Sequence, residues 1–226
     1  MVNILEIDYL VKYGRSMANA NSPSPRSQRT RASLIAAGLD LLVDRPIDAI
    51  PIDDVVVRAG VAKGSFFNHF ADKQDFAAAV AAEVREEVEG RVARANAGVA
   101  DPVARIAGGM VVAAAFAEAE PRLATVLLRS QTPATSQSHP LNRGLRADIE
   151  AALELGLLRP EARGAGVLYW LGLCHVLMVN LVDTRPSREE AAQILSDMLA
   201  LGLSGLGVPL HRAQDLARIS RSPASK

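Results

Sequence analysis

The stretch from Val55 to Lys73 reads VVVRAGVAKGSFFNHFADK, and it decides the fold. A short apolar helix is expected to end at Ala59, and a tight turn follows at residues 60–61. The second short helix has a polar side and an aromatic side, which carry Lys63, Ser65, Asn68 and His69, and Phe66, Phe67 and Phe70, respectively. Two short helices joined at a glycine are typical of a helix-turn-helix, whose second helix lies in the DNA major groove.

The composition of the 226-residue chain favours an all-α protein. Hydrophobic residues make up 49% of the chain and aromatic residues only 4%, and alanine, the best helix former, is abundant. The formal net charge is zero, which counts mildly against a DNA-binding protein. Contacts with DNA phosphates would therefore depend on local clusters of positive charge. The single cysteine, Cys174, excludes an intrachain disulfide and fits a reducing cytoplasm.

Hydrophobic periodicity predicts helices throughout the chain and no strands. Asp72 is suited to be the N-cap of a long fourth helix, and Ser187 with Glu190 forms a capping box before the last one. The predicted helices cover about 27–44, 52–59, 63–69, 73–95, 141–155, 161–182 and 187–203, and two more begin at Asp101 and Pro121.

The termini and domain boundaries follow from the same pattern. Residues 1–26 are expected to be a flexible extension, and translation from Met1 or from Met17 are equally weighted alternatives. Residues 27–72 form a predicted helix-turn-helix domain, residues 73–210 a second helical domain, and residues 211–226 a tail. We expect no signal peptide and no run of ~20 apolar residues that would span a membrane.

The helix-turn-helix residues also resemble those of a known family. The matching segments are Ile52-Asp53-Asp54-Val55, Ala59-Gly60-Val61, Lys63-Gly64-Ser65-Phe66-Phe67, Phe70 and Asp72-Lys73. Over about residues 30–76 the chain resembles the TetR family of bacterial transcriptional regulators. The resemblance implies an all-helical homodimer in which a three-helix DNA-binding domain precedes a larger domain for small molecules and dimerisation.

The predicted DNA contacts lie in and just after the second short helix. Lysine can contact phosphate or guanine, Ser and Asn can donate to bases or phosphates, and Gly64 allows close approach to the groove. Family members often carry a capping hydroxyl where this chain has Ala62, and a tyrosine where it has Phe67. His69 either contacts phosphate or packs at the domain edge, and the arginines at 26, 29 and 31 form either a DNA-contacting arm or a solvated tail. The predicted set is Lys63, Gly64, Ser65, Phe67, Asn68, His69 and Lys73.

The second domain offers candidates for a ligand pocket and a dimer interface. Aromatic and methionine side chains favour an apolar or aromatic effector, although ordinary core packing explains any one of them. The pocket candidates are Met110, Phe116, Leu127, Trp170, Cys174 and Met178, with Tyr169 and His175 as further candidates. The predicted dimer interface is a four-helix contact of the last two long helices through Leu177, Ile194, Leu195, Met198 and Leu199.

No residue pattern supports catalysis, a metal site or a cofactor. Cys174 and His175 are helix neighbours that point about 100° apart, and the chain lacks a P-loop, a nucleophile elbow and a dinucleotide-binding motif. We therefore expect a cytoplasmic, ligand-responsive repressor that binds a near-palindromic operator as a dimer. The alternatives are an activator, a regulator of the MarR type, and a helical binding protein for apolar small molecules. The MarR type is disfavoured because no β-wing pattern follows the second short helix.

Overall fold

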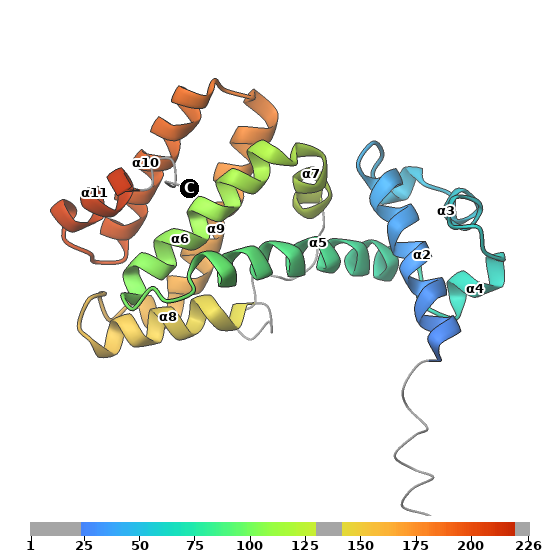
Figure 1. The fold of residues 1–226 in the computed structure, drawn as a ribbon, viewed down its shortest axis with the longest axis horizontal. Coiled ribbons are helices and arrows are strands. Elements are labelled where there is room, and N and C mark those ends of the chain that lie inside the picture. Colours follow the sequence, from blue (N-terminus) through green and yellow to red (C-terminus); the bar gives the residue numbers. More distant parts are fainter. Residues whose placement is uncertain (1–23, 130–141, 220–226) are drawn as a thin grey trace, which may run out of the picture.

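The computed structural model describes residues 24–129 and 142–219, which form ten α-helices, one short 3-10 helix and no strand (Figure 1). The predicted all-α fold is therefore confirmed for this part of the chain. The elements are α2 (Pro25–Leu42), η1 (Ile47–Ala49), α3 (Ile52–Ala59), α4 (Lys63–Phe67), α5 (Lys73–Ala95), α6 (Pro102–Ala119), α7 (Pro121–Arg129), α8 (Arg143–Glu154), α9 (Ala162–Thr184), α10 (Arg188–Gly205) and α11 (Leu210–Ile219).

Several predictions fall outside the described residues. These are the extension before residue 24, the choice between Met1 and Met17, the polar loop at 130–140, and the end of the predicted tail after residue 219. The predicted division between residues 72 and 73 falls at the start of α5, a helix that takes part in both domains (Figure 1).

The first helix begins two residues earlier than predicted. The Ser24 hydroxyl oxygen accepts from the Ser27 backbone N–H at 3.2 Å, and Pro25 occupies the first helical position. Proline is well suited to that position because it has no N–H to leave unpaired. The arginines at 26, 29 and 31 consequently lie within α2, so the predicted arm or tail is wrong for them.

The N-terminal domain consists of α2, η1, α3, α4 and the first turns of α5. Its core holds Phe66, Phe70 and Phe76, whose ring centroids lie 5.0–5.5 Å apart, together with Leu34 and Val55. Each of these five side chains is at most 3% exposed. Aromatic rings at such distances add favourable edge contacts to the burial of apolar surface.

Helix α5 runs from the N-terminal domain into the C-terminal domain as one continuous element (Figure 1). The predicted N-cap is confirmed, since Asp72 Oδ1 accepts from the backbone N–H groups of Gln74 and Asp75 at 2.8 Å. Near its start, Phe76 and Val80 pack on Gly38 of α2, where a Cβ atom would lie 2.5 Å and 2.6 Å from them. The close approach of α2 and α5 therefore depends on a glycine.

The C-terminal domain is built around α6, which packs against α5, α7, α8, α9, α10 and α11. The predicted capping box before α10 is confirmed, because Ser187 accepts from the Glu190 backbone N–H and Glu190 accepts from the Ser187 backbone N–H. Further along α10, Gly202 and Gly205 allow close packing on α9, where added Cβ atoms would meet Leu173, Trp170 and Tyr169 within 3.0 Å.

Residues after 210 continue the fold. Helix α11 packs against α10 and α6, and its Ala213 and Ala217 are buried. Arg212 Nη2 also donates to Asp101 Oδ2 at 2.8 Å, which ties α11 to the start of α6. The predicted tail is therefore wrong for residues 211–219, whose buried face of small alanine side chains at a four-residue spacing was overlooked in the sequence.

Two helices, α6 and α9, are long and apolar enough to span a bilayer by length and composition. The expectation that no segment meets this test is too strong. A core helix also passes it, and α6 is such a helix, since half of its apolar window is buried in the protein. Helix α9 is a third buried, so much of its apolar surface lies on the outside of the domain.

Candidate nucleic-acid interface and ligand cavity

The turn between α3 and α4 is set by Gly60. Its φ of +67° lies in the left-handed region, which glycine adopts without the strain that a side chain would add. The Val61 backbone N–H then donates to the Val56 carbonyl at 3.0 Å, which closes the end of α3. This geometry directs the chain into α4 at a fixed angle.

Helix α4 is held by one buried side chain. Phe66 is 0% exposed, and its ring lies 5.5 Å from Phe70 and 5.3 Å from Phe76. The helix has no side-chain cap at Ala62, as the sequence predicts, and it ends at Phe67 rather than at His69. Because a five-residue helix is not stable alone, packing through Phe66 must hold it in place.

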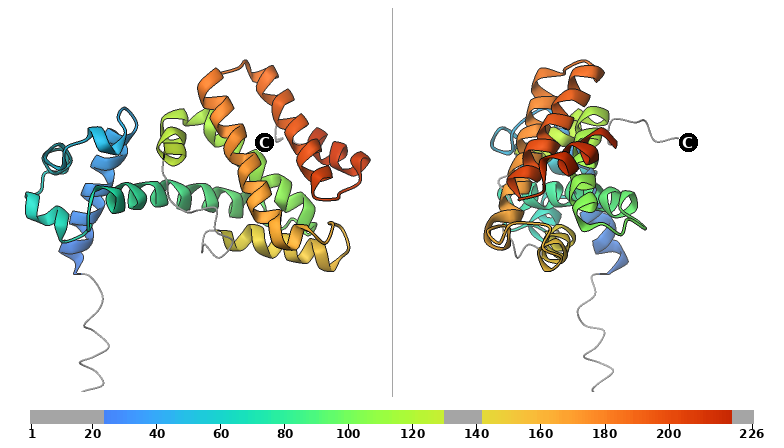
Figure 2. Two further views of the ribbon diagram at one scale, coloured as in Figure 1. Left: turned by 180° about the vertical axis from the view of Figure 1, so that it is seen from behind. Right: turned by 90° about the vertical axis from the view of Figure 1, so that its left-hand side faces the viewer.

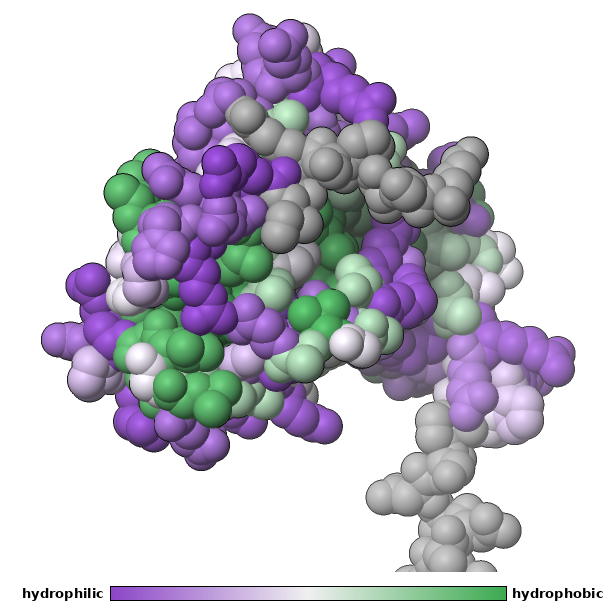
Figure 3. All heavy atoms as spheres, turned by 60° about the vertical axis from the view of Figure 1, so that its left-hand side comes forward, coloured by the Kyte–Doolittle hydropathy of each residue, from purple (hydrophilic) through white to green (hydrophobic). Residues whose placement is uncertain are grey.

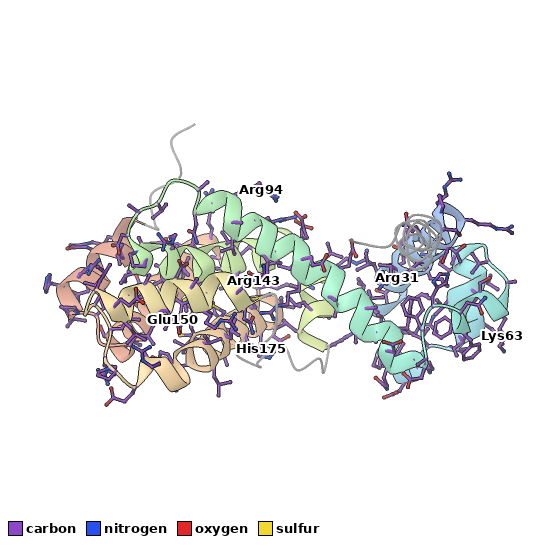
Figure 4. The ribbon with its side chains drawn as sticks, turned by 90° about the horizontal axis from the view of Figure 1, so that it is seen from below. Arg31, Lys63, Arg94, Arg143, Glu150 and His175 are labelled. Atoms are coloured by element: carbon purple, nitrogen blue, oxygen red, sulfur yellow. The ribbon has the colours of Figure 1, made fainter. Side chains whose placement is uncertain are left out.

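The outer face of α4 presents most of the predicted DNA contacts. Lys63, Gly64 and Asn68 are exposed, Phe67 is 55% exposed, and Ser65 is half-buried. Lys63 Nζ lies 2.9 Å from Asp53 Oδ1, and both side chains are more than half exposed. Such a surface ion pair is worth little, so the lysine can exchange it for another anion. Figure 4 shows Lys63 at the end of the molecule farthest from the C-terminal domain.

The last two predicted contacts already have partners in the chain. Lys73 Nζ donates to the Asp48 carbonyl at 3.2 Å, so its position at the start of α5 does not require a phosphate. His69 is half-buried, and its ring lies 6.2 Å from that of Phe70. Both residues lie beside the exposed face of α4 rather than on it.

A cavity of about 250 Å³ lies in the C-terminal domain between α5, α6, α7, α8 and α9. Four of the predicted pocket residues line it: Leu127, Trp170, Cys174 and Met178. Met110 and Phe116 do not line it, although both are buried side chains of α6. Tyr169 and His175 also do not, since they lie on the exposed side of α9.

Sequence reasoning missed the polar wall of this cavity. Arg85 Nη2 donates to Asn142 Oδ1 at 2.7 Å and lies 3.7 Å from Glu89 Oε1. Nearby, Arg105 Nε donates to Asp148 Oδ1 at 2.7 Å. The sequence did contain a signal for this wall. Arg85 and Glu89 lie one helical turn apart, next to the buried stripe of Ala81, Val84 and Val88. A charged pair beside such an apolar stripe is unusual.

Burial changes the protonation behaviour of three groups in the cavity wall. Desolvation raises the pKa of the Glu89 carboxyl, and it lowers the pKa of the Arg85 guanidinium. Desolvation also raises the pKa of the Cys174 thiol to about 12, so this thiol is neutral and a poor nucleophile at neutral pH. Within residues 24–129 and 142–219, no group of three or more His, Cys, Asp or Glu side chains is placed to hold a metal ion.

Comparison with known proteins supports the interpretation of the N-terminal domain. A family described as "Bacterial regulatory proteins, tetR family" matches residues 34–80, which extend from α2 to the second turn of α5. The N-terminal domain is a TetR-family domain. The match ends at Val80, the last α5 residue that packs on Gly38, and it includes the whole of α4.

Two curated proteins each match about a quarter of the chain. An uncharacterised HTH-type transcriptional regulator, YwcC of Bacillus subtilis, is 41% identical over 51 residues, which is 23% of each chain. The transcriptional regulator AcuR of Cereibacter sphaeroides is 35% identical over 57 residues, 25% of this chain and 26% of AcuR. The alignments therefore span about a quarter of the length of these relatives.

Solved structures extend the likeness in fold to most of the chain. A putative tetR family transcription regulator from Shewanella sp. PV-4 has a TM-score of 0.68 at 20% identity, covering 78% of this chain and 97% of that one. RolR in complex with resorcinol has a TM-score of 0.59 at 21% identity, with 89% and 97% coverage. A gamma-butyrolactone receptor, described as ArpA-like, has a TM-score of 0.53 at 24% identity, with 87% and 98% coverage. At these identities the likeness shows a shared fold.

The predicted dimer residues divide into two groups. Leu177 and Leu199 are at most 1% exposed, so they pack inside the chain and that part of the prediction is wrong. Because α9 is apolar nearly all round, its periodicity does not reveal which side faces inward. Ile194, Leu195 and Met198 are half-buried on α10. The exposed apolar side chains of α9 and α10 are instead Leu168, Tyr169, Val176 and Leu201.

Proposed function

We propose that the protein is a ligand-responsive transcriptional regulator, acting as a cytoplasmic homodimer that represses from a near-palindromic operator. The observation that supports this most directly is the exposed polar face of α4, held by the buried Phe66 in a TetR-family domain. Lys63, Ser65 and Asn68 are suited to contact bases and phosphates of the major groove. Gly64 supports close approach, since a Cβ atom there would meet nothing within 4 Å.

The dimer contact is proposed to lie on α9 and α10. Leu168, Val176 and Leu201 are 52%, 60% and 70% exposed, although they are large apolar residues. Helix α9 lies at the front of the C-terminal domain when the molecule is seen from behind (Figure 2). Figure 3 shows a different side of the domain, where hydrophobic residues also reach the surface. Gly172 on the same side of α9 leaves open space for a partner helix. Contiguous exposed apolar patches of this kind mark interaction surfaces.

The cavity is the proposed effector site, and two helices connect it to the N-terminal domain. Helix α5 lines the cavity with Val88 and Val92, and its first turns pack on Gly38. Helix α7 lines the cavity with Leu127, and two residues later Arg129 Nη1 donates to the carbonyls of residues 42 and 43 at 3.4 and 3.2 Å. An effector that favours one arrangement of these helices would change the spacing of the two α4 helices in the dimer.

Fluorescence anisotropy tests DNA binding most directly. The labelled probe is the DNA upstream of the protein's own coding sequence, with unrelated DNA as control, at two salt concentrations. We expect tight, selective binding that weakens steeply with salt, because phosphate contacts release counterions. Lys63→Ala and Asn68→Ala should lose selectivity, and Arg94→Ala, an exposed cation at the far end of α5 (Figure 4), should not.

The anisotropy experiment, together with a transcription reporter, separates the alternatives. Equally weak binding to both DNAs, with little salt dependence, would favour a helical binding protein for small apolar molecules, an alternative that the neutral net charge supports. Selective binding followed by increased transcription of a reporter would favour an activator over a repressor.

Light scattering after size-exclusion chromatography tests the dimer surface. We expect Val176→Glu and Leu201→Glu to give monomers, because each places a charge in the centre of an apolar contact. Val57→Glu is the matched control, since Val57 is 79% exposed on α3 in the N-terminal domain. A dimer that persists in both α9 and α10 variants would place the interface elsewhere.

A further inference from the structure

The cavity is not a simple apolar pocket, because its wall carries polar groups that lack partners. Four buried side-chain nitrogen or oxygen atoms have no hydrogen-bond partner within residues 24–129 and 142–219, and two of them are Arg85 Nε and Trp170 Nε1. Both side chains line the cavity. A buried N–H without an acceptor costs free energy, which an acceptor on a bound molecule recovers once the side chain turns toward it.

The charged pair beside these groups is also incompletely satisfied. Arg85 Nη2 lies 3.7 Å from Glu89 Oε1, which is too far for a hydrogen bond. By contrast, the neighbouring Arg105 makes three hydrogen bonds: Nε donates to Asp148 Oδ1 at 2.7 Å, and Nη1 donates to the carbonyls of residues 99 and 100 at 2.9 and 3.0 Å. The pair of Arg105 and Asp148 therefore stabilises the wall, whereas Arg85 and Glu89 can still form hydrogen bonds with a ligand.

The charge balance of the wall selects among possible ligands. Arg85 with Glu89, and Arg105 with Asp148, give equal numbers of positive and negative groups, and the other polar lining groups, Asn96, Asn142 and the Cys174 thiol, are neutral. A carboxylate ligand would place a second negative charge beside Glu89 in a partly desolvated site, which is unfavourable. A hydroxyl group is neutral, and it can accept from Arg85 and donate to Glu89 at the same time.

The rest of the wall fixes the size and character of the ligand. Val88, Ile106, Ala113, Leu127 and Leu171 are among the apolar lining residues, and Gly109 adds room because it has no side chain. An apolar cavity of about 150 Å³ holds a benzene molecule. A cavity of about 250 Å³ therefore accommodates one substituted ring or a short aliphatic body.

We propose that this cavity binds a small neutral alcohol or phenol, whose hydroxyl group accepts from Arg85 and donates to Glu89 while its apolar body fills the rest. The proposal rests on the proposed effector role of the cavity, but it concerns binding alone and is measured without DNA. Trp170 provides a local signal, because it is the only tryptophan of the chain and it lines the cavity.

Isothermal titration calorimetry of the full chain tests the ligand class with phenol and cyclohexanol against toluene and benzoate. We expect the better hydroxyl compound to bind at least about tenfold more tightly than toluene and benzoate, since hydrogen bonds to charged groups are among the stronger ones. Cyclohexanol, which has no aromatic absorption, should change Trp170 fluorescence. Failure of both hydroxyl compounds to bind, toluene equal to both, or benzoate as the tightest ligand would each overturn the proposal.

Two variants and one control locate the hydroxyl contact. Arg85→Lys removes the planar donor set, so the preference for phenol over toluene should fall to about threefold or less, and unchanged toluene binding shows that the cavity is intact. Glu89→Gln should leave phenol within about threefold, because the amide oxygen still accepts, and should improve benzoate binding. Glu86→Gln, an exposed neighbour on α5, should change neither. An unchanged phenol preference in Arg85→Lys would contradict the assigned contact.

The outcomes of the two proposals are separable. Selective operator binding without a hydroxyl preference in the cavity would refute the ligand class and leave the regulator in place. A hydroxyl preference without selective DNA binding would refute the regulator and leave the ligand class in place.

Discussion

The two ends of α5 lie in different chemical environments. At the N-terminal end, Phe76 and Val80 are at most 1% exposed and pack on Gly38. Toward the other end, Arg85 and Glu89 place a loosely paired cation and anion in a cavity wall. Among the described residues, four buried side-chain atoms lack a partner; they belong to Arg85, Trp170, Asn180 and Ser204, and none lies in residues 24–80 of the N-terminal domain.

This difference separates two structural tasks. The N-terminal domain must hold a five-residue helix in one orientation, so its core is closed, and no buried side-chain nitrogen or oxygen of residues 24–80 lacks a partner. The C-terminal domain keeps a cavity with unsatisfied donors, which lowers its stability but allows a ligand to add stabilising contacts. Local instability near a binding site is expected when ligand binding is to shift a conformational equilibrium.

The largest expected change in stability comes from a substitution in the closed core of the N-terminal domain. Phe66→Ala should destabilise this domain by about 3–5 kcal/mol, because it removes a fully buried ring that touches three others. Urea unfolding followed by far-UV circular dichroism and by Trp170 fluorescence measures it. We expect the Trp170 transition to shift less, since Trp170 lies in the C-terminal domain. Equal shifts in both signals would show that the domains unfold as one unit.

A smaller effect distinguishes two glycines of the N-terminal domain. Gly38→Ala should destabilise the protein by about 1–3 kcal/mol, because the new Cβ would lie 2.5 Å from Phe76 Cζ. Gly64→Ala should stabilise it by about 0.5–1 kcal/mol, since a helical alanine there meets nothing within 4 Å. Thermal unfolding compares the two. Operator binding should nevertheless weaken in Gly64→Ala, and an unchanged affinity would show that α4 does not approach DNA at this residue.

The two domains also differ in what the sequence predicts. The helix-turn-helix was predictable because its turn requires a glycine, its core requires Phe66 and Phe70, and Asp72 caps the helix that follows it. In the C-terminal domain the existence of α9 and α10 was predictable from length and apolar content. Which side of α9 faces inward was not, because the helix is apolar nearly all round, so Leu177 was assigned to a surface that it does not line.

The polar wall of the cavity depends on contacts between distant segments. Arg85 meets Asn142, which is 57 residues away in the chain, and Arg105 meets Asp148. A single sequence offers no local pattern for such pairs, whereas capping contacts such as Ser187 with Glu190 join residues three apart and could be predicted. The contact of Arg129 in α7 with the carbonyls of residues 42 and 43 also joins distant segments, so it could not be predicted either.

The contact of Arg129 with the end of α2 predicts a change of about 1 kcal/mol in the coupling between ligand binding and operator binding. Arg129→Ala removes donors to the last carbonyls of α2, so it should leave cavity binding unchanged and reduce the effect of a bound ligand on operator affinity by about 1 kcal/mol. Arg122→Ala is the matched control, because Arg122 and Asp44 form an ion pair at 3.4 Å with both side chains 70% exposed. Anisotropy titrations with and without ligand measure the coupling. Equal coupling in both variants would leave α5 as the only connection.

The smallest expected effect concerns the capping box of α10. As in the N-terminal domain, its hydrogen-bonding groups have partners. Hydrogen bonds from the Ser187 hydroxyl and backbone N–H lower the pKa of Glu190 below its ordinary value. The stabilisation is therefore present above the ordinary pKa of glutamate and is lost as the pH falls through the lowered pKa. Ser187→Ala should lower the Tm slightly at neutral pH and should make less difference in acid. Thermal unfolding of both proteins across this pH range measures the difference. A constant difference in Tm at all pH values would show that the Ser187 side chain caps the helix without involving the charge of Glu190.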